Sequence, residues 1–198
     1  YKLAINTDPK YASALADYST VLAIKGNWQE AEQLAKRAVE EKPFEALYRK
    51  NYARILAKLG RHDECIAQLE KAYNLNSKDQ VVLTALASEM MLKKDFTMAV
   101  NLLERAVKLY PKSSSLHNRL SHALAKAGDI SNALLHANQA VHCDPNSDTA
   151  LVNLGSTMIL DGNLQGAQIQ YEKAVSINPK NPDAHYLLSQ TYAKSGKP

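Results

Sequence analysis

The stretch ALVNLGSTMILDGNLQGAQIQYEKAVSINP, residues 150–179, decides the fold, because it reads as two helices joined by a turn and closed by a proline. Apolar residues recur at helical spacing on both sides of Gly162, and strand-like alternation is absent from the sequence. Glycine allows the tight turn between two antiparallel helices, and proline ends the second helix. The stretch therefore predicts a helical hairpin.

The same landmarks recur along the whole chain with a period of 34 residues and without an insertion. The prolines that end second helices are Pro9, Pro43, Pro111, Pro145 and Pro179, with Ser77 at the vacant step. The turn glycines are Gly26, Gly60, Gly128, Gly162 and Gly196, with Lys94 as the exception. We expect a strained turn at Lys94 and a softer junction at Ser77. Such a period predicts stacked copies of one helical hairpin.

This pattern resembles the tetratricopeptide repeat (TPR) family over essentially the whole chain. The resemblance implies an all-α fold, a right-handed α-solenoid of stacked antiparallel helix pairs. We expect the end of a preceding repeat at 1–11, and the first helix of a further repeat at 182–198. The full repeats expected between them are 12–45, 46–79, 80–113, 114–147 and 148–181. Both ends interrupt a repeat, so we expect the chain to be a fragment of a longer array.

Composition and motifs argue against several function classes. Hydrophobic residues make up 45% and charged residues 22% of the 198 residues, with a net charge of +4. This is globular composition with too weak a basic bias for a dedicated nucleic-acid binder. The longest apolar runs fall well short of a membrane span, and Cys65 and Cys143 lack metal-binding spacing. Because nucleotide loops and HExxH motifs are also absent, we expect a non-enzymatic, cytoplasmic protein with neither cofactor nor metal.

The resemblance further implies that the first helix of each repeat lines a concave groove in which partners lie as extended peptides or short helices. Helical geometry selects the groove-facing residues that we expect to bind a peptide. They are Lys50, Asn51, Arg54, Lys58, Met91, Leu92, Asn118, Arg119, His122, Lys126, Asn153, Ile159 and Leu160. On the last two first helices the same face also includes Thr149, Val152, Ser156, Asp183, Tyr186, Leu187, Gln190 and Lys194.

Basic and apolar stretches alternate along this face, which favours a segment that carries acidic residues with apolar anchors between them. Helices spaced about 10 Å apart would place the two basic rows roughly 20 Å apart, or about six residues of extended chain. The competing interpretation is a solvated surface, where exposed ion pairs contribute only about 0–1 kcal/mol each.

One TPR subgroup binds C-terminal carboxylates through a two-carboxylate clamp. Lys50 and Arg119 match that pattern, whereas Arg54, Ala85 and Ser115 depart from it. We therefore do not expect a clamp of this kind.

Another subgroup holds peptide backbone with a ladder of asparagines, which Asn51 and Asn153 match only locally. Two other functions stay open. The chain could self-assemble through its open ends, or it could recruit substrates for a larger enzyme such as a glycosyltransferase or sulfotransferase.

Overall fold

The computed structural model describes residues 1–8 and 10–195, and folds them into twelve helices with no strand among them. Pro9 and Gly196, two members of the periodic columns, lie outside the described residues. The helices are α1 (Lys2–Thr7), α2 (Ala12–Ile24), α3 (Trp28–Glu41), α4 (Ala46–Lys58), α5 (His62–Leu75), α6 (Gln80–Leu92), α7 (Phe96–Leu109), α8 (Ser114–Ala127), α9 (Ile130–Cys143), α10 (Asp148–Leu160), α11 (Leu164–Ile177) and α12 (Pro182–Ser195). The expected all-α solenoid is confirmed.

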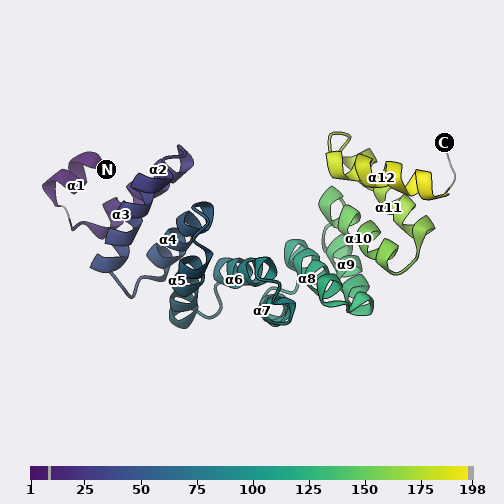
Figure 1. The fold of residues 1–198 in the computed structure, drawn as a ribbon, viewed down its shortest axis with the longest axis horizontal. Coiled ribbons are helices and arrows are strands. Elements are labelled where there is room, and N and C mark those ends of the chain that lie inside the picture. The colour runs from purple at the N-terminus through teal and green to yellow at the C-terminus, as the bar shows by residue number, and fades with distance from the viewer. Residues whose placement is uncertain (9, 196–198) are drawn as a thin grey trace. The chain divides into compact units, whose positions relative to one another are not determined.

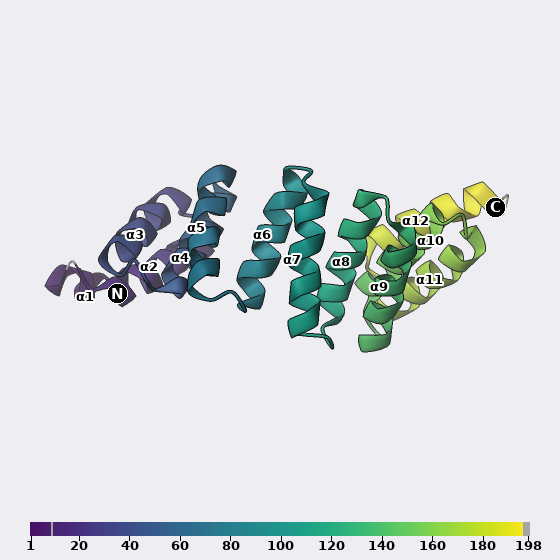
Figure 2. The same cartoon turned by 90° about the horizontal axis from the view of Figure 1, so that it is seen from below.

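The chain divides into two compact units, residues 1–89 and 90–198, and the division falls within α6. In the first unit α2 pairs with α3 and α4 pairs with α5, while α3 packs on α4 (Figure 1). In the second unit α8 pairs with α9 and α10 with α11, and Figure 2 shows α8 and α9 side by side. The first helices of successive pairs also touch, α8 with α10 and α10 with α12.

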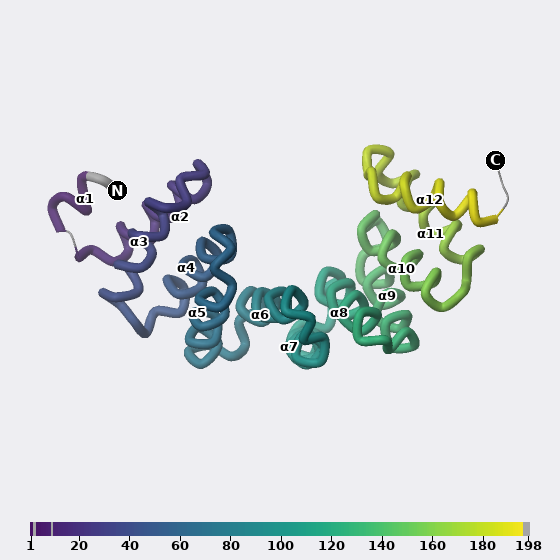
Figure 3. The backbone as a smooth tube through the Cα atoms, in the orientation of Figure 1, coloured from purple at the N-terminus to yellow at the C-terminus, as the bar shows by residue number. Residues whose placement is uncertain are grey.

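Short turns between the paired helices depend on left-handed backbone, and the tube in Figure 3 traces each of these turns. The four described turn glycines, Gly26, Gly60, Gly128 and Gly162, have φ between 74° and 90°. Lys94 has φ of 62° at the equivalent step, and is the one non-glycine residue with positive φ among the described residues. A side chain in this region costs roughly 1–2 kcal/mol, so the expected strain at this turn is present.

Helix starts in the second unit are defined by side-chain caps. Asp95, Ser113, Asp129, Ser147 and Asn163 each accept a hydrogen bond from the backbone N–H three residues on. Each bond satisfies one of the donors that a helix start leaves unpaired. The same residues that separate the apolar stretches in the sequence therefore set the helix boundaries.

The cores of both units are built from small residues at the helix–helix contacts. The alanines at one periodic position, Ala38, Ala72, Ala106, Ala140 and Ala174, are all fully buried. Cys65 stands in a second such column and is 2% exposed, as a small packing residue should be. Small residues allow the helices to approach closely, which directs the polar face of each first helix away from the core.

Candidate functional site

A hollow of about 720 Å³ lies in the second unit, between residues of α8 and α10 and one residue of α12. Its walls come from the first helices of the pairs. The lining residues are Asn118, Arg119, His122, Ala125, Lys126, Thr149, Val152, Asn153, Ser156, Thr157, Leu160 and Asp183. Six of the thirteen predicted peptide-binding residues are therefore brought together here.

One wall of the hollow is basic. Arg119, His122 and Lys126 stand three and four residues apart on α8, so they share one helical face, and all three are exposed. Solvent reaches the His122 ring, yet partial burial and then the Lys126 ammonium lower the pKa of this histidine. Asp183 is the one acid among the described residues that line the hollow. The wall therefore favours anions, and His122 gains charge only below its usual pKa.

The floor of the hollow is a network of polar side chains between α8 and α10. The Asn153 amide nitrogen donates to Ser121 Oγ at 3.1 Å and to the Asn118 carbonyl oxygen at 3.4 Å. Thr157 Oγ1 donates in turn to the Asn153 carbonyl oxygen at 2.8 Å. Because the Asn153 amide nitrogen already donates to two groups on α8, the side-chain oxygen of Asn153 is the group left to accept a hydrogen bond from an arriving peptide N–H.

Asn118 lines the same floor, and its Oδ1 is buried without a hydrogen-bond partner in the described part of the chain. An unpaired buried acceptor costs about 1–3 kcal/mol. Rotation of this amide toward a bound donor would remove that cost.

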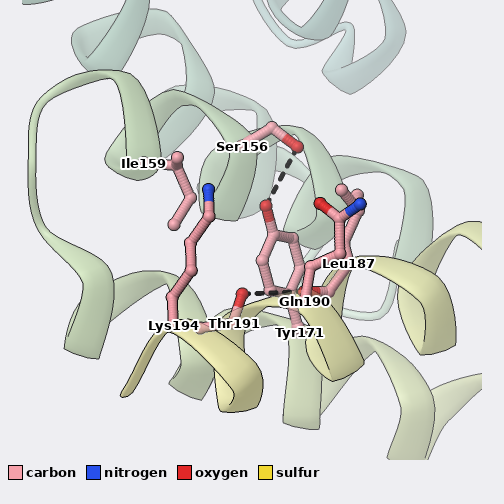
Figure 4. Close-up of a pocket in the computed structure, with 7 residues that line it drawn as sticks. All are labelled: Ser156, Ile159, Tyr171, Leu187, Gln190, Thr191 and Lys194. Atoms are coloured by element: carbon pink, nitrogen blue, oxygen red, sulfur yellow. Dashed lines mark hydrogen bonds between the residues drawn. The ribbon is translucent and has the colours of Figure 1, made fainter. Parts of the chain in front are cut away.

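A smaller pocket of about 100 Å³ adjoins the hollow, and Ser156 lines both. It lies between α10, α11 and α12 (Figure 4). The lining residues are Ser156, Ile159, Tyr171, Leu187, Gln190, Thr191 and Lys194. The predicted residue Ile159 belongs to this pocket, whereas its neighbour Leu160, 59% exposed, belongs to the hollow.

Tyr171 forms the inner wall of the pocket, and sequence reasoning about first helices missed it because it lies on the second helix α11. Its ring is 1% exposed and packs against Gly155, where an added Cβ would lie 2.6 Å from Tyr171 Cε1. The hydroxyl is 3.1 Å from Ser156 Oγ. Burial raises the pKa of Tyr171, and the bond with Ser156 acts in the opposite direction. The signal in the sequence was the pairing of a glycine with a tyrosine, unique to this repeat.

Four predicted residues, Lys50, Asn51, Arg54 and Lys58, lie on α4 in the first unit and do not line the hollow. Lys50 is partly buried, and its Nζ is 2.8 Å from Asp79 Oδ2. Arg54 and Lys58 are exposed, and neither forms a hydrogen bond or ion pair with a described residue. The Lys50 charge is thus already paired within the chain.

Asp79 has a structural task as well, because its other carboxylate oxygen accepts from the N–H groups of Val81 and Val82 at the start of α6. Burial acts to raise the pKa of Asp79, but the bonds from Lys50 and from these two N–H groups outweigh it and hold the pKa below its usual value.

The last two predicted residues, Met91 and Leu92, end α6 and line neither the hollow nor the pocket. Leu92 is 64% exposed and Met91 is half-buried.

A membrane-spanning role finds no support in the described residues, since none of their helices is both long enough and apolar enough to cross a bilayer. Groups of three or more His, Cys, Asp or Glu side chains suited to a metal ion are likewise not found among them.

Two family models for tetratricopeptide repeats match the chain. One, described as "Tetratricopeptide repeat", matches residues 19–79 and 93–148, more than half of the sequence. The other, described as "TPR repeat", matches residues 158–196. No curated protein sequence matches the chain.

Solved structures of TPR proteins share the fold. YrrB, described as a TPR protein with an unusual peptide-binding site, is 20% identical with a TM-score of 0.74, covering 93% of this chain and 95% of that one. MamA from Desulfovibrio magneticus RS-1 is 16% identical with a TM-score of 0.78, covering 86% and 97%. PilF from Pseudomonas aeruginosa is 16% identical with a TM-score of 0.79, covering 93% and 84%. At these identities the likeness establishes the fold alone.

The repeats and the TPR-protein neighbours together support a protein-interaction scaffold. With its 34-residue period, its paired helices and a family match over more than half of its length, the chain belongs to the tetratricopeptide repeat family.

Proposed function

We propose that the hollow between α8, α10 and α12 binds an extended segment of another protein that carries acidic residues. The observation that carries this proposal is the make-up of the walls. Arg119, His122 and Lys126 form one side, while Val152 and Leu160 present apolar surface on α10. A cleft that is mainly apolar with a few convergent polar groups is the usual form of a binding site.

The open shape of the hollow, rather than its volume, supports a peptide over a small metabolite. At about 720 Å³ the hollow is as large as a site for a drug-sized ligand, yet it is open along the helix faces and has only one basic wall. An extended chain can place one carboxylate near Arg119 and still pass over Leu160. The unusual peptide-binding site described for YrrB is consistent with this use of the fold.

The direct test is selection of ligands from a random library of ten-residue peptides, followed by affinity measurements on charge-reversed variants. We expect the selected peptides to be enriched in Asp and Glu. Arg119→Glu combined with Lys126→Glu should weaken their binding at least tenfold, since close interfacial charge pairs can each contribute above about 1.4 kcal/mol. Neutral or basic selected peptides would contradict the proposal.

A matched control has the same change of net charge outside the hollow. Lys173→Glu combined with Lys180→Glu provides it, because both lysines are exposed and line neither cavity. Equal weakening in this control would mean that bulk charge, rather than the α8 wall, attracts the peptide.

The α4 row in the first unit needs a different variant. Reversal of Lys50 would break its ion pair with Asp79 and disturb the start of α6, so loss of binding and loss of structure would be confused. Arg54→Glu combined with Lys58→Glu avoids this, because neither residue has a partner in the described part of the chain.

A further inference from the structure

The pocket beside the hollow differs from it in chemistry. Ile159, the Tyr171 ring and Leu187 provide its apolar walls, from α10, α11 and α12. Figure 4 shows these three side chains around one space, with Lys194 and Gln190 reaching over it from α12. The pocket is therefore a separate place for one side chain, within reach of a segment in the hollow.

The hydroxyl groups inside the pocket already form hydrogen bonds within the chain. Ser156 Oγ donates to the Val152 carbonyl oxygen at 2.9 Å and lies 3.1 Å from the Tyr171 hydroxyl. Thr191 Oγ1 donates to the Leu187 carbonyl oxygen at 2.7 Å. A polar side chain would lose its hydration here without gaining these donors, so the pocket favours an apolar occupant.

The size of the pocket narrows the occupant further. An engineered protein cavity of about 150 Å³ is known to hold benzene. The pocket here has about 100 Å³, smaller than that cavity, so it suits a branched aliphatic side chain better than an aromatic ring. Leucine, isoleucine or valine is therefore the occupant that its shape fits.

Lys194 adds a charge at the rim. It is exposed and forms no ion pair with a described residue, and in Figure 4 its side chain extends from α12 toward α10. Helix α12 lies on the far side of α10 from α8, so the rim charge and the basic wall flank the pocket. Asp183 lies in the first turn of α12 and lines the hollow, whereas Lys194 lies in the last turn of the same helix, so the acid is well separated from the rim charge.

Resting on the proposed function, we propose that the pocket seats one aliphatic side chain of the bound segment, with an adjacent carboxylate at Lys194 and a second acidic group at the α8 wall. The distance from the pocket to α8 is about one and a half helix spacings, or about 12–15 Å. Extended chain covers this in about four residues. The recognised motif is thus an acidic residue, then an aliphatic residue four positions later, with a second acidic residue directly after the aliphatic one.

The test uses the peptide acetyl-Glu-Glu-Ser-Ser-Ser-Leu-Glu-amide and its reversed sequence, titrated into the full chain with NMR detection. Replacement of the leucine by alanine should raise the dissociation constant about tenfold. Phenylalanine should bind no better than alanine, because its ring suits the pocket poorly. Lys194→Gln should raise the dissociation constant about threefold for the leucine peptide.

Two pocket variants and one control complete the design. Ile159→Phe obstructs the pocket and should make the leucine and alanine peptides bind equally. Leu135→Phe, on exposed surface of α9, should leave the tenfold preference intact. If Ile159→Phe fails to fold, Gly155→Ala combined with Tyr171→Leu removes the tyrosine wall instead.

That second variant copies the residues that other repeats place at the same two positions, Ala53 with Leu69 and Ala87 with Leu103, all of them buried. It should reduce the preference for leucine at least threefold. The pocket proposal would be overturned if the leucine, alanine and phenylalanine peptides bound the unchanged protein equally. If binding were still lost on charge reversal of the α8 wall, the proposed function would stand. Failure of the forward and the reversed leucine peptide to bind the unchanged protein would overturn the pocket proposal and the proposed function together.

Discussion

The contact between Gly155 and Tyr171 gives the sharpest test of how this array is packed. An alanine Cβ at position 155 would lie 2.6 Å from Tyr171 Cε1 and 2.9 Å from Cδ1 and Cζ, closer than carbon atoms can approach. The ring cannot move aside easily, because it is buried and its hydroxyl is bonded to Ser156. Overpacking of this kind costs about 1–3 kcal/mol.

Gly155 lies inside α10, where alanine would otherwise stabilise the helix by about 0.5–1 kcal/mol. We therefore expect Gly155→Ala to lower the free energy of unfolding by about 1–2 kcal/mol. In a Tyr171→Leu background the clash is gone, and the same substitution should stabilise by about 0.5–1 kcal/mol. The change of sign separates the clash from any general effect of the substitution.

Amide hydrogen exchange in α10 and α11 is the appropriate assay, because stacked repeats unfold in parts rather than in one step. Urea unfolding followed by circular dichroism provides the global comparison. Increased protection of α10 in Gly155→Ala, with Tyr171 in place, would refute this packing of the ring on the glycine. So would equal effects of the substitution in the two backgrounds.

Three other predictions test separate features. Lys94→Gly should raise the free energy of unfolding by up to about 1 kcal/mol in urea titrations, because it removes a side chain from backbone with φ of 62°; an unchanged or lower value would contradict the strain. Partial burial, and then the Lys126 ammonium, lower the pKa of His122 below its usual value of 6.5, so this histidine gains its charge only below that pH, and acidic peptides should bind more tightly as the pH falls below about 6.5. A His122→Gln variant that keeps the whole pH dependence would contradict this. Burial, and then the Glu89 carboxylate, raise the pKa of Cys65 to about 12. N-ethylmaleimide should therefore label Cys143 in the folded protein and Cys65 only after unfolding, which peptide mass mapping can measure.

The fold was predictable because it depends on residues that repeat. A glycine every 34 residues marks each turn, and alanines at fixed positions mark each helix contact, so even the departure at Lys94 pointed to a strained turn. The polar face of α8 followed from helical geometry together with the family resemblance, and Arg119, His122 and Lys126 do share one wall. The turns, the helix contacts and the polar face of a helix can all be predicted from the repeat period and the helical register, without knowledge of tertiary contacts.

The site was less predictable where it depends on partners far apart in the sequence. Lys50 and Asp79 are separated by 29 residues, and no periodic rule states that this lysine bonds to that carboxylate. Tyr171 reaches the pocket from a second helix, because Gly155 leaves room for its ring. Both features depend on single side chains that depart from the repeat, and the period alone does not state which residues those side chains contact.

The two basic rows, alike in sequence, therefore differ as sites for anions. On α4 the Lys50 ammonium is paired at 2.8 Å with a carboxylate that α6 needs for its own start, so an arriving acid would have to compete with Asp79. Only Arg54 and Lys58 are left to act on a ligand from that row. On α8 all three basic side chains line an open hollow, and the acid there, Asp183, comes from α12 rather than from the wall itself. Because a competing internal ion pair reduces the gain from an external one, Lys50 should contribute less to the binding of an acidic segment than Lys126 on the α8 wall.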